Sequence, residues 1–351
     1  MEGSLQTYWF VIVTVMLAVY VVLDGFDFGT GIIYLFAARS DLERRTVLRA
    51  IGPVWNGNEV WLIAGGGLLF FAFPKVYAAG FSGFYLALII VLWLLMFRGL
   101  SIELRSHVDH PLWHLFWDAS FAVASLLLAI VFGAALGNLL RGVPLTAQGY
   151  FFTALWTTFA PGPEPGILDW YTILMGVLGA VILTVHGANY LAMKTGGDLY
   201  QRTCRIARLT GWLTAGLSVV AILATAFVQP ALRHNYDAHP LGYVVPLLGA
   251  VALAGMLYFR WRGQDVAAFM ASSAFIVGML GGAAWGLFPN LLLATKDPAL
   301  SLTVYNSAAP GGLGIGLVWF AVGISLVITY TVYVYRSFWG KVELSSLEGK
   351  E

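Results

Sequence analysis

The sequence is short of charge and of cysteine. Of its 351 residues only 11% are charged and 59% are hydrophobic, whereas a soluble globular domain carries roughly 25% charged residues. The single cysteine, Cys204, excludes an intramolecular disulfide and a cysteine cluster for a metal. A net charge of +1 leaves no basic patch large enough for nucleic acid, so no nucleic-acid partner is expected. This composition indicates an integral membrane protein.

Long apolar runs fill most of the chain. A helix that crosses a bilayer needs ~20 apolar residues. The N-terminal segment MEGSLQTYWF lacks the basic start of a signal peptide, so the first run is expected to be a retained span. We predict an all-α integral membrane protein with nine transmembrane helices. The predicted spans are 8–37, 51–74, 79–104, 113–139, 170–193, 209–232, 242–260, 266–290 and 313–336.

The basic residues predict the orientation of these spans. Fourteen of the 19 Lys and Arg residues fall in segments on one side, four fall on the other side, and Arg98 lies inside the third span. Cytoplasmic loops carry the excess of Lys and Arg in membrane proteins. The N-terminus is therefore expected outside and the C-terminus in the cytoplasm. The regular alternation also supports the number of nine spans.

Two stretches of the chain resemble each other and predict an internal repeat. DLERRT at Asp41–Thr46 is similar to DLYQRT at Asp198–Thr203, and Asp24–Asp27 corresponds to His186–Asn189 upstream. The copies lie four spans apart and so have the same orientation; chance similarity of a six-residue loop is the alternative. We predict two parallel four-helix halves and one extra helix. The expected segments are 1–140, the external loop 141–168, 169–290, the external loop 291–312, and the ninth helix with its cytoplasmic tail at 313–351.

Polar residues inside the predicted spans form the candidate site. At ~1.5 Å per helical residue, Asp27 lies roughly 15 Å from the cytoplasmic end of its span, and Asp24 lies one turn deeper. Charged side chains inside a membrane usually face a bundle interior or a water-filled cavity. The polar residues all fall in the cytoplasmic half, which predicts a route for proton uptake. The candidates are Asp24, Asp27, Asn56, Glu59, Arg98, Asp118 and His186.

Structural roles compete with this interpretation. Asp24 and Asp27 could be packing acids with satisfied hydrogen bonds, and Arg98 suits a counter-charge better than a proton carrier. His186 could ligate a haem iron, but a six-coordinate haem needs a second strong ligand. The other five histidines lie at or near loops. We therefore favour a hydrogen-bonding or proton-relay role for His186, and we expect no metal site.

Five motifs carry a resemblance to a known family. In chain order they are GFDFG at 25–29, WNGNEVWL at 55–62, FPKVYAAGFSGFY at 73–85, HGANYLAMKT at 186–195 and SLTVYN at 301–306. Together they resemble subunit II of cytochrome bd-type quinol:oxygen oxidoreductase. The similarity extends from the first span to the last external loop.

This resemblance implies a function in the bacterial cytoplasmic (inner) membrane. The family forms a terminal oxidase of the respiratory chain that oxidises quinol and reduces dioxygen to water. The resemblance implies that haem b, haem d and the quinol site belong to the partner subunit I, and that this chain binds no haem. Subunit II would support subunit I and contribute a route for protons. A small single-helix accessory subunit and a bound lipid or quinone are further partners to consider.

The chain departs from the family at one point. Many members have an aspartate where this chain has Asn56 and a glutamine where it has Glu59. An amide does not titrate, so the proton role of that aspartate cannot pass to Asn56. Because residues three apart share a helix face, we expect Glu59 to take it over.

Two other functions remain open from the residues. A proton-coupled secondary transporter would also have repeats and buried acids, but its helices are often interrupted near the midplane in both repeats. Here the acids lie off the midplane and the second repeat lacks them. A purely structural partner of a catalytic subunit is the other alternative.

Overall fold

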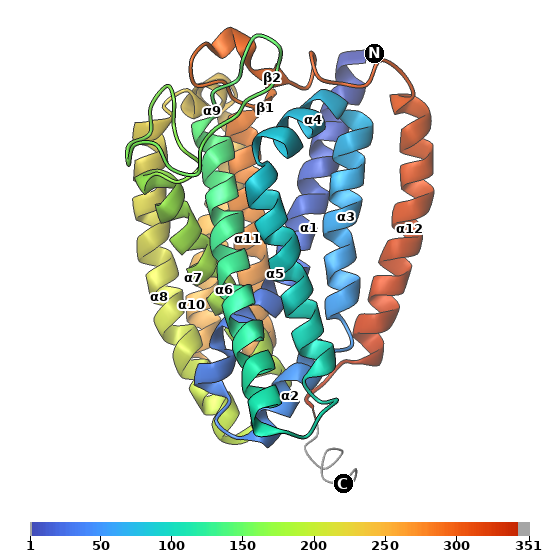
Figure 1. Cartoon of the computed structure of the whole chain (residues 1–351), viewed down its shortest axis with the longest axis vertical. Helices are drawn as coiled ribbons and strands as arrows, with labels where there is room; N and C mark the ends of the chain where they lie inside the picture. Colours follow the sequence, from blue (N-terminus) through green and yellow to red (C-terminus); the bar gives the residue numbers. More distant parts are fainter. Residues whose placement is uncertain (1, 343–351) are drawn as a thin grey trace.

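The computed structural model describes residues 2–342, and nearly all of this part of the chain is helical (Figure 1). Twelve α-helices form within it, most of them aligned with one long axis. They are α1 Glu2–Ala37, α2 Asp41–Ile51, α3 Trp55–Ala72, α4 Pro74–Gly83, α5 Tyr85–Leu104, α6 Pro111–Arg141, α7 Trp170–Lys194, α8 Gly197–Val228, α9 Leu232–Ala238, α10 Val244–Trp261, α11 Asp265–Leu287 and α12 Leu313–Ser337.

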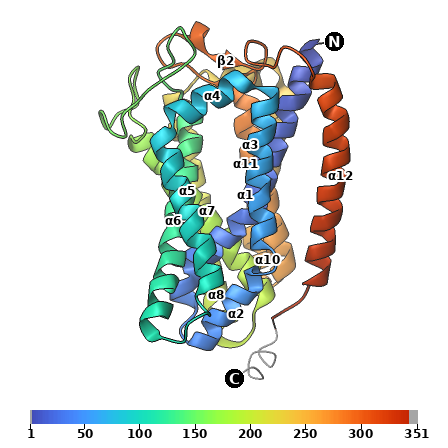
Figure 2. The ribbon, with the colours of Figure 1, turned by 45° about the vertical axis from the view of Figure 1, so that its right-hand side comes forward.

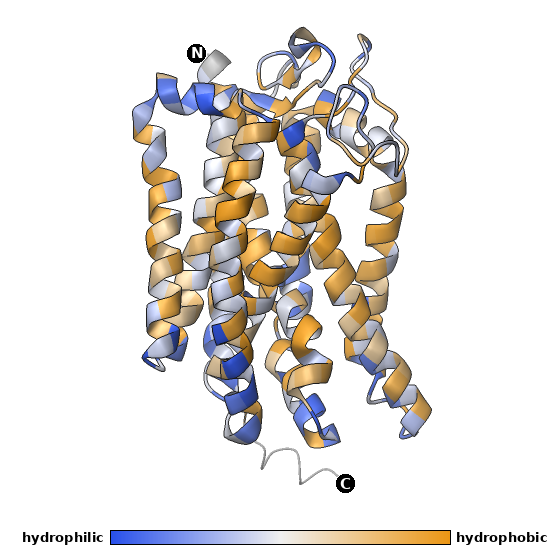
Figure 3. Ribbon diagram, turned by 90° about the vertical axis from the view of Figure 1, so that its left-hand side faces the viewer, coloured by the Kyte–Doolittle hydropathy of each residue, from blue (hydrophilic) through white to orange (hydrophobic). Residues whose placement is uncertain are grey.

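Eight helices within residues 2–342 are long and apolar enough to cross a membrane, namely α1, α5, α6, α7, α8, α10, α11 and α12. The helices are largely hydrophobic along their length, and polar residues gather at their lower ends (Figure 3). The chain is therefore a multi-pass membrane protein, as predicted. The predicted span 51–74 corresponds to α3, which is not among the eight because its first turns contain Asn56, Asn58 and Glu59. It runs alongside α1 and α12 in the same bundle (Figure 1).

Three predicted boundaries were wrong. The predicted span 79–104 joins two elements, because α4 lies across one end of the molecule between α3 and α5 and only α5 descends (Figure 2). The predicted loop after the first span contains α2, whose start is fixed by a capping box between Ser40 and Glu43. Helix α8 begins at Gly197 rather than at 209, since a helix can continue beyond the apolar part of its sequence.

Helix α7 is the centre of the bundle and α12 is its periphery. In α7, two-thirds of the most apolar 18-residue stretch is buried. This helix packs on α1, α6, α8 and α11. In α12, no residue of the most apolar 18-residue stretch is buried. Helices α1 and α7 cross at Gly29 and Gly187, where a Cβ on Gly29 would lie 1.8 Å from the Leu183 carbonyl oxygen. Only glycine permits so close a crossing.

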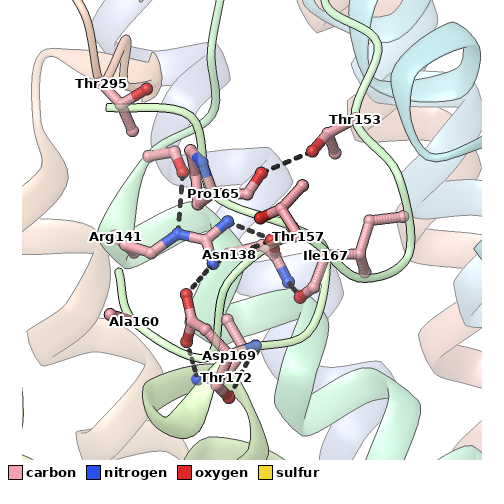
Figure 4. A network of polar contacts seen from close by, with 12 residues as sticks. Asn138, Arg141, Thr153, Thr157, Ala160, Pro165, Ile167, Asp169, Thr172 and Thr295 are labelled. Atoms are coloured by element: carbon pink, nitrogen blue, oxygen red, sulfur yellow. Dashed lines mark hydrogen bonds and ion pairs between the residues drawn. The ribbon is translucent and has the colours of Figure 1, made fainter. Parts of the chain in front are cut away.

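One buried ion pair anchors the long loop that precedes α7 (Figure 4). Arg141, at the end of α6, pairs with Asp169 and donates hydrogen bonds to the Asn138 side chain at 2.7 Å and to the Gly166 carbonyl at 3.1 Å. Asp169 also caps α7, because its Oδ1 accepts a hydrogen bond from the Thr172 N–H at 2.9 Å. The Pro/Gly run at 160–166 forms no helix.

The second loop at this end contains the only β-structure in residues 2–342, apart from isolated bridges. Strands β1 (Asn290–Leu292) and β2 (Leu302–Thr303) pair antiparallel. The bridge between Val143 and Ala294 connects this hairpin to the loop after α6. The two loops therefore form one cover over this end of the bundle.

The glycine crossing predicts a specific sensitivity to a single methyl group. Gly29→Ala places its Cβ against α7 backbone, and overpacking of a tight contact costs about 1–3 kcal/mol. We expect a lower thermal unfolding midpoint for the purified protein. Gly67→Ala is the matched control, because nothing lies within 4 Å of a Cβ at that helical glycine. Equal midpoints for the two variants would refute the close crossing.

Candidate functional site

A buried ion pair joins α1 to α5. Arg98 Nη1 lies 2.6 Å from Asp24 Oδ1, and both side chains have no exposed surface. Glu59 on α3 approaches the same guanidinium, with Oε2 3.6 Å from Nη2, and its side chain is 23% exposed. The guanidinium also lies over the Phe28 ring, 4.5 Å from the centroid. One arginine thus connects carboxylates from two other helices.

A second group of hydrogen bonds surrounds Asp27. Asn58 Nδ2 donates to Asp27 Oδ2 at 2.8 Å and to the Leu23 carbonyl at 3.1 Å. The Tyr335 hydroxyl, from the far end of the sequence, donates to Asn58 Oδ1 at 2.8 Å. Asn58 on α3 therefore connects Asp27 on α1 to Tyr335 on α12. The sequence prediction missed both Asn58 and Tyr335.

Several polar atoms near these acids retain hydrogen-bonding capacity. Asp24 Oδ2, Asp27 Oδ1 and the Thr30 hydroxyl are buried and make no hydrogen bond to the part of the chain that the structure describes. Thr30 lies one turn from Asp27 on α1. Unsatisfied buried polar atoms are costly and often mark a functional site or bound water. Each of these atoms can accept or donate a further bond, as a proton-transfer site requires.

Asn56 does not join this site. Its side chain is exposed on α3, and among residues 2–342 no hydrogen bond connects it to Asp24, Asp27 or Glu59. The amide that reaches the acids is Asn58, two residues further along. The WNGNE segment signalled that α3 carries polar residues, but it did not indicate which asparagine faces α1.

Asp118 lies in a separate cluster at the end of the bundle near α2. Its carboxylate accepts hydrogen bonds from the Tyr34 hydroxyl at 2.6 Å, Arg105 Nε at 2.5 Å and Arg44 Nη1 at 2.8 Å. Arg105 also contacts Asp41 at 2.7 Å. The carboxylate thus connects α1, α2 and the end of α5 to α6. This arrangement favours a structural role for Asp118.

His186 is fully buried with both ring nitrogens occupied. Nε2 lies 2.8 Å from the Val22 carbonyl, which can only accept, so Nε2 carries the hydrogen. Nδ1 lies 2.7 Å from the Ser272 hydroxyl, and the ring stacks on Phe269 with centroids 4.9 Å apart. Within residues 2–342 no group of three or more His, Cys, Asp or Glu side chains could hold a metal ion. Both ring nitrogens of His186 are thus in contact with protein groups.

Comparison with solved structures defines the class of protein. A chain of the bd oxidase from Geobacillus thermodenitrificans matches this one with a TM-score of 0.77, covering 95% of this chain and 98% of that chain at 17% identity. At this low identity the match shows the fold. The protein is a helical membrane protein with the fold of a bd oxidase chain.

Comparisons of sequence then identify the family. The model for cytochrome bd terminal oxidase subunit II matches residues 5–338. Cytochrome bd-I ubiquinol oxidase subunit 2 of Escherichia coli (strain K12) is 30% identical over 371 residues, 98% of this chain and 97% of the relative. Cytochrome bd ubiquinol oxidase subunit 2 of Bacillus subtilis (strain 168) is 32% identical over 309 residues, 88% and 87% of the two chains. The chain belongs to the cytochrome bd terminal oxidase subunit II family.

Membership confirms the resemblance read from the motifs. The chain is a subunit of an oxidoreductase complex of the respiratory chain, and the complex uses haems. A subunit II implies a subunit I partner.

The role of Asp118 can be tested by removing its charge. In Asp118→Asn the buried Arg105 loses its main counter-charge, and breaking a buried pair in this way costs about 3–5 kcal/mol. We expect a large loss of thermal stability, with quinol oxidase activity per folded complex retained. Tyr34→Phe removes one hydrogen bond to the same carboxylate and should cost about 1 kcal/mol. Full stability with low activity would instead place Asp118 in the proton route.

The contacts of Glu43, at the same end of the molecule, predict that the stability of the protein depends on pH. Burial by itself raises the pKa of Glu43. The backbone N–H groups of Arg39 and Ser40 and the guanidinium of Arg202 have a larger effect in the opposite direction, so the pKa lies below its usual value. The pKa of a glutamate in an unfolded chain is ~4.3. The ionised Glu43 therefore stabilises the folded protein fully above the pKa of the unfolded chain. This contribution is lost as the pH falls through the lower pKa of the folded protein.

We expect Glu43→Gln to lower the thermal midpoint at neutral pH, and the difference from the unchanged protein to shrink in acid. The measurement is a series of thermal unfolding curves between about pH 6 and about pH 3. A difference that does not change with pH would show that the charge of Glu43 is unimportant.

Proposed function

We propose that this chain supports the haem-carrying subunit I of a terminal quinol oxidase and contributes a route for protons from the cytoplasm. The observation that carries the proposal is the buried group of Asp24, Arg98 and Glu59. Making water from dioxygen consumes protons, and charged groups inside a membrane are costly to retain without a function. Haem b, haem d and the quinol site are assigned to the partner. Ubiquinol, named for the Escherichia coli and Bacillus subtilis relatives, is the substrate class proposed for the complex.

In this proposal α3 is a ninth span, and the helices form two parallel halves of four, 1–140 and 169–290, followed by α12. The helix neighbours support this arrangement. Helix α1 packs on α3 and α6 as α7 packs on α8 and α11, and α5 packs on α6 as α10 packs on α11. The excess of Lys and Arg at the α2 end supports a cytoplasmic position for that end in a bacterial inner membrane. The N-terminus is then outside.

Each polar residue has a distinct task on the proposed route. Glu59 has the most exposed carboxylate of the group and exchanges protons with the exterior of the bundle. Arg98 is the direct counter-charge of Asp24. Asn58 positions Asp27 but does not relay a proton, because an amide does not titrate. His186 positions α7 against α1 through its bond to the Val22 carbonyl.

The alternatives differ in what supports them. No comparison supports a proton-coupled transporter. A purely structural partner without a proton route is the remaining competitor, and it makes the opposite prediction for Glu59. A small single-helix accessory subunit and a bound lipid or quinone remain further proposals for the complex.

The decisive variant is Glu59→Gln, which removes the charge and keeps the size. We expect the quinol oxidase activity of the purified complex to fall by roughly tenfold or more, since positioned acid–base groups commonly contribute about a hundredfold or more. Glu59→Asp should restore part of the activity. Asn56→Ala, at an exposed position of the same helix, is the matched control and should remain active.

The haem spectrum separates a lost proton route from a lost complex. The b and d bands of the reduced-minus-oxidised spectrum should be unchanged in Glu59→Gln. Unimpaired oxidase activity in this variant would overturn the proposal and favour the structural partner. Loss of the haem bands would show that Glu59 holds the complex together.

A further inference from the structure

A large pocket opens at the α2 end of the molecule, outside the group of buried acids. Its volume is about 1240 Å³. The walls come from α2, the end of α5, the end of α7 and the segment that follows α12. This segment is fixed against α7, because the Val342 N–H donates to the Lys194 carbonyl at 2.9 Å. The pocket is therefore built from four separate parts of the chain.

The lining of the pocket carries an excess of positive charge. Five cationic side chains line it, namely Arg45, Arg49, Arg105, Lys194 and Lys341, together with the two carboxylates Glu103 and Asp109. Arg45 and Arg105 share the nearby Asp41, at 2.7 Å each, and Arg105 also pairs with Asp118. The five cations therefore face four carboxylates, and the remaining positive charge favours an anionic ligand.

Two of these cations are buried and retain donors. The Arg105 side chain is 2% exposed, and its Nη1 makes no hydrogen bond to residues 2–342. Lys194 is 7% exposed and uses one donor for the Phe338 carbonyl at 2.6 Å, whereas an ammonium group has three. Buried donors with unused capacity are the feature that distinguishes a built anion site from a merely charged surface.

The surroundings of the pocket are those of a membrane interface. Phe338 and Trp339 line its rim and are more than half exposed. Exposed tryptophan at the end of a spanning helix is typical of the level of the lipid headgroups. On α5, Leu100 is exposed one turn from Glu103 at the pocket wall, and Phe97 is exposed one turn further along the helix. An apolar surface thus leads from the pocket toward the middle of the membrane.

We propose that this pocket binds the phosphate of an anionic phospholipid, with the acyl chains along the exposed face of α5. Basic pockets between helices on the cytoplasmic side are suited to such headgroups. Arg49 and Lys341 attract the phosphate at the opening, and Arg105 and Lys194 face it from the wall. A free phosphate ion would satisfy the same cations but would not use the apolar face.

The test counts lipids on the purified complex of this chain with its partner. The pocket variant is Arg49→Gln with Lys341→Gln, and the matched control is Arg205→Gln with Arg208→Gln, which removes the same charge from exposed positions of α8 outside the pocket. After extensive detergent washing, native mass spectrometry measures retained phosphatidylglycerol or cardiolipin. We expect retention to fall at least twofold in the pocket variant and to be unchanged in the control.

The other outcomes overturn the proposal in distinguishable ways. Displacement of the lipid by excess inorganic phosphate would make the pocket a site for free anions. Equal retention in both double variants would show that no specific lipid binds there.

Discussion

The structure depends on the ion pair between Asp24 and Arg98. Two charges without exposed surface are stable only together, because either one alone would be an uncompensated charge in a low-dielectric interior. The pair therefore requires α5 to stay in register with α1. Glu59, Asn58 and Tyr335 then take positions around charges that are already neutralised. Through them α3 and α12 are connected to the centre by polar contacts.

The neighbouring helices α1 and α7 hold their buried polar residues in different ways. On α1, Asp24 is paired with Arg98. On α7, His186 is held between the Val22 carbonyl and the Ser272 hydroxyl, which are both uncharged. These uncharged contacts require no further charged group where α1 and α7 cross closely at Gly29. The ion pair therefore lies on the side of α1 that meets α5, and the contacts of His186 lie where α1 meets α7.

Much of the fold could be predicted from the sequence, because length and hydrophobicity suffice to locate most membrane helices. The failures occur where polarity is misleading: five of the eleven residues of α2 are charged, and α4 continues an apolar run in a different direction. At the site, residue type was informative but direction was not. Side chains two positions apart on a helix point in directions about 200° apart, so Asn56 and Asn58 face opposite sides of α3. Only the packing of α3 against α1 determines which of the two asparagines reaches the buried acids. Tyr335 lies 277 residues from Asn58, a distance over which no local pattern exists.

The direction of α3 also explains why the position of the carboxylate matters. Asn56 faces the exterior of the bundle, whereas Glu59 lies within reach of the Arg98 guanidinium. An acid at position 56 would exchange protons without direct contact with a buried charge. With the acid at position 59, each proton taken up on the proposed route removes one of the two carboxylates that neutralise Arg98. Asp24 then carries the whole counter-charge until the proton moves on. Proton uptake in this chain would thus be coupled to the same ion pair that connects α1 to α5.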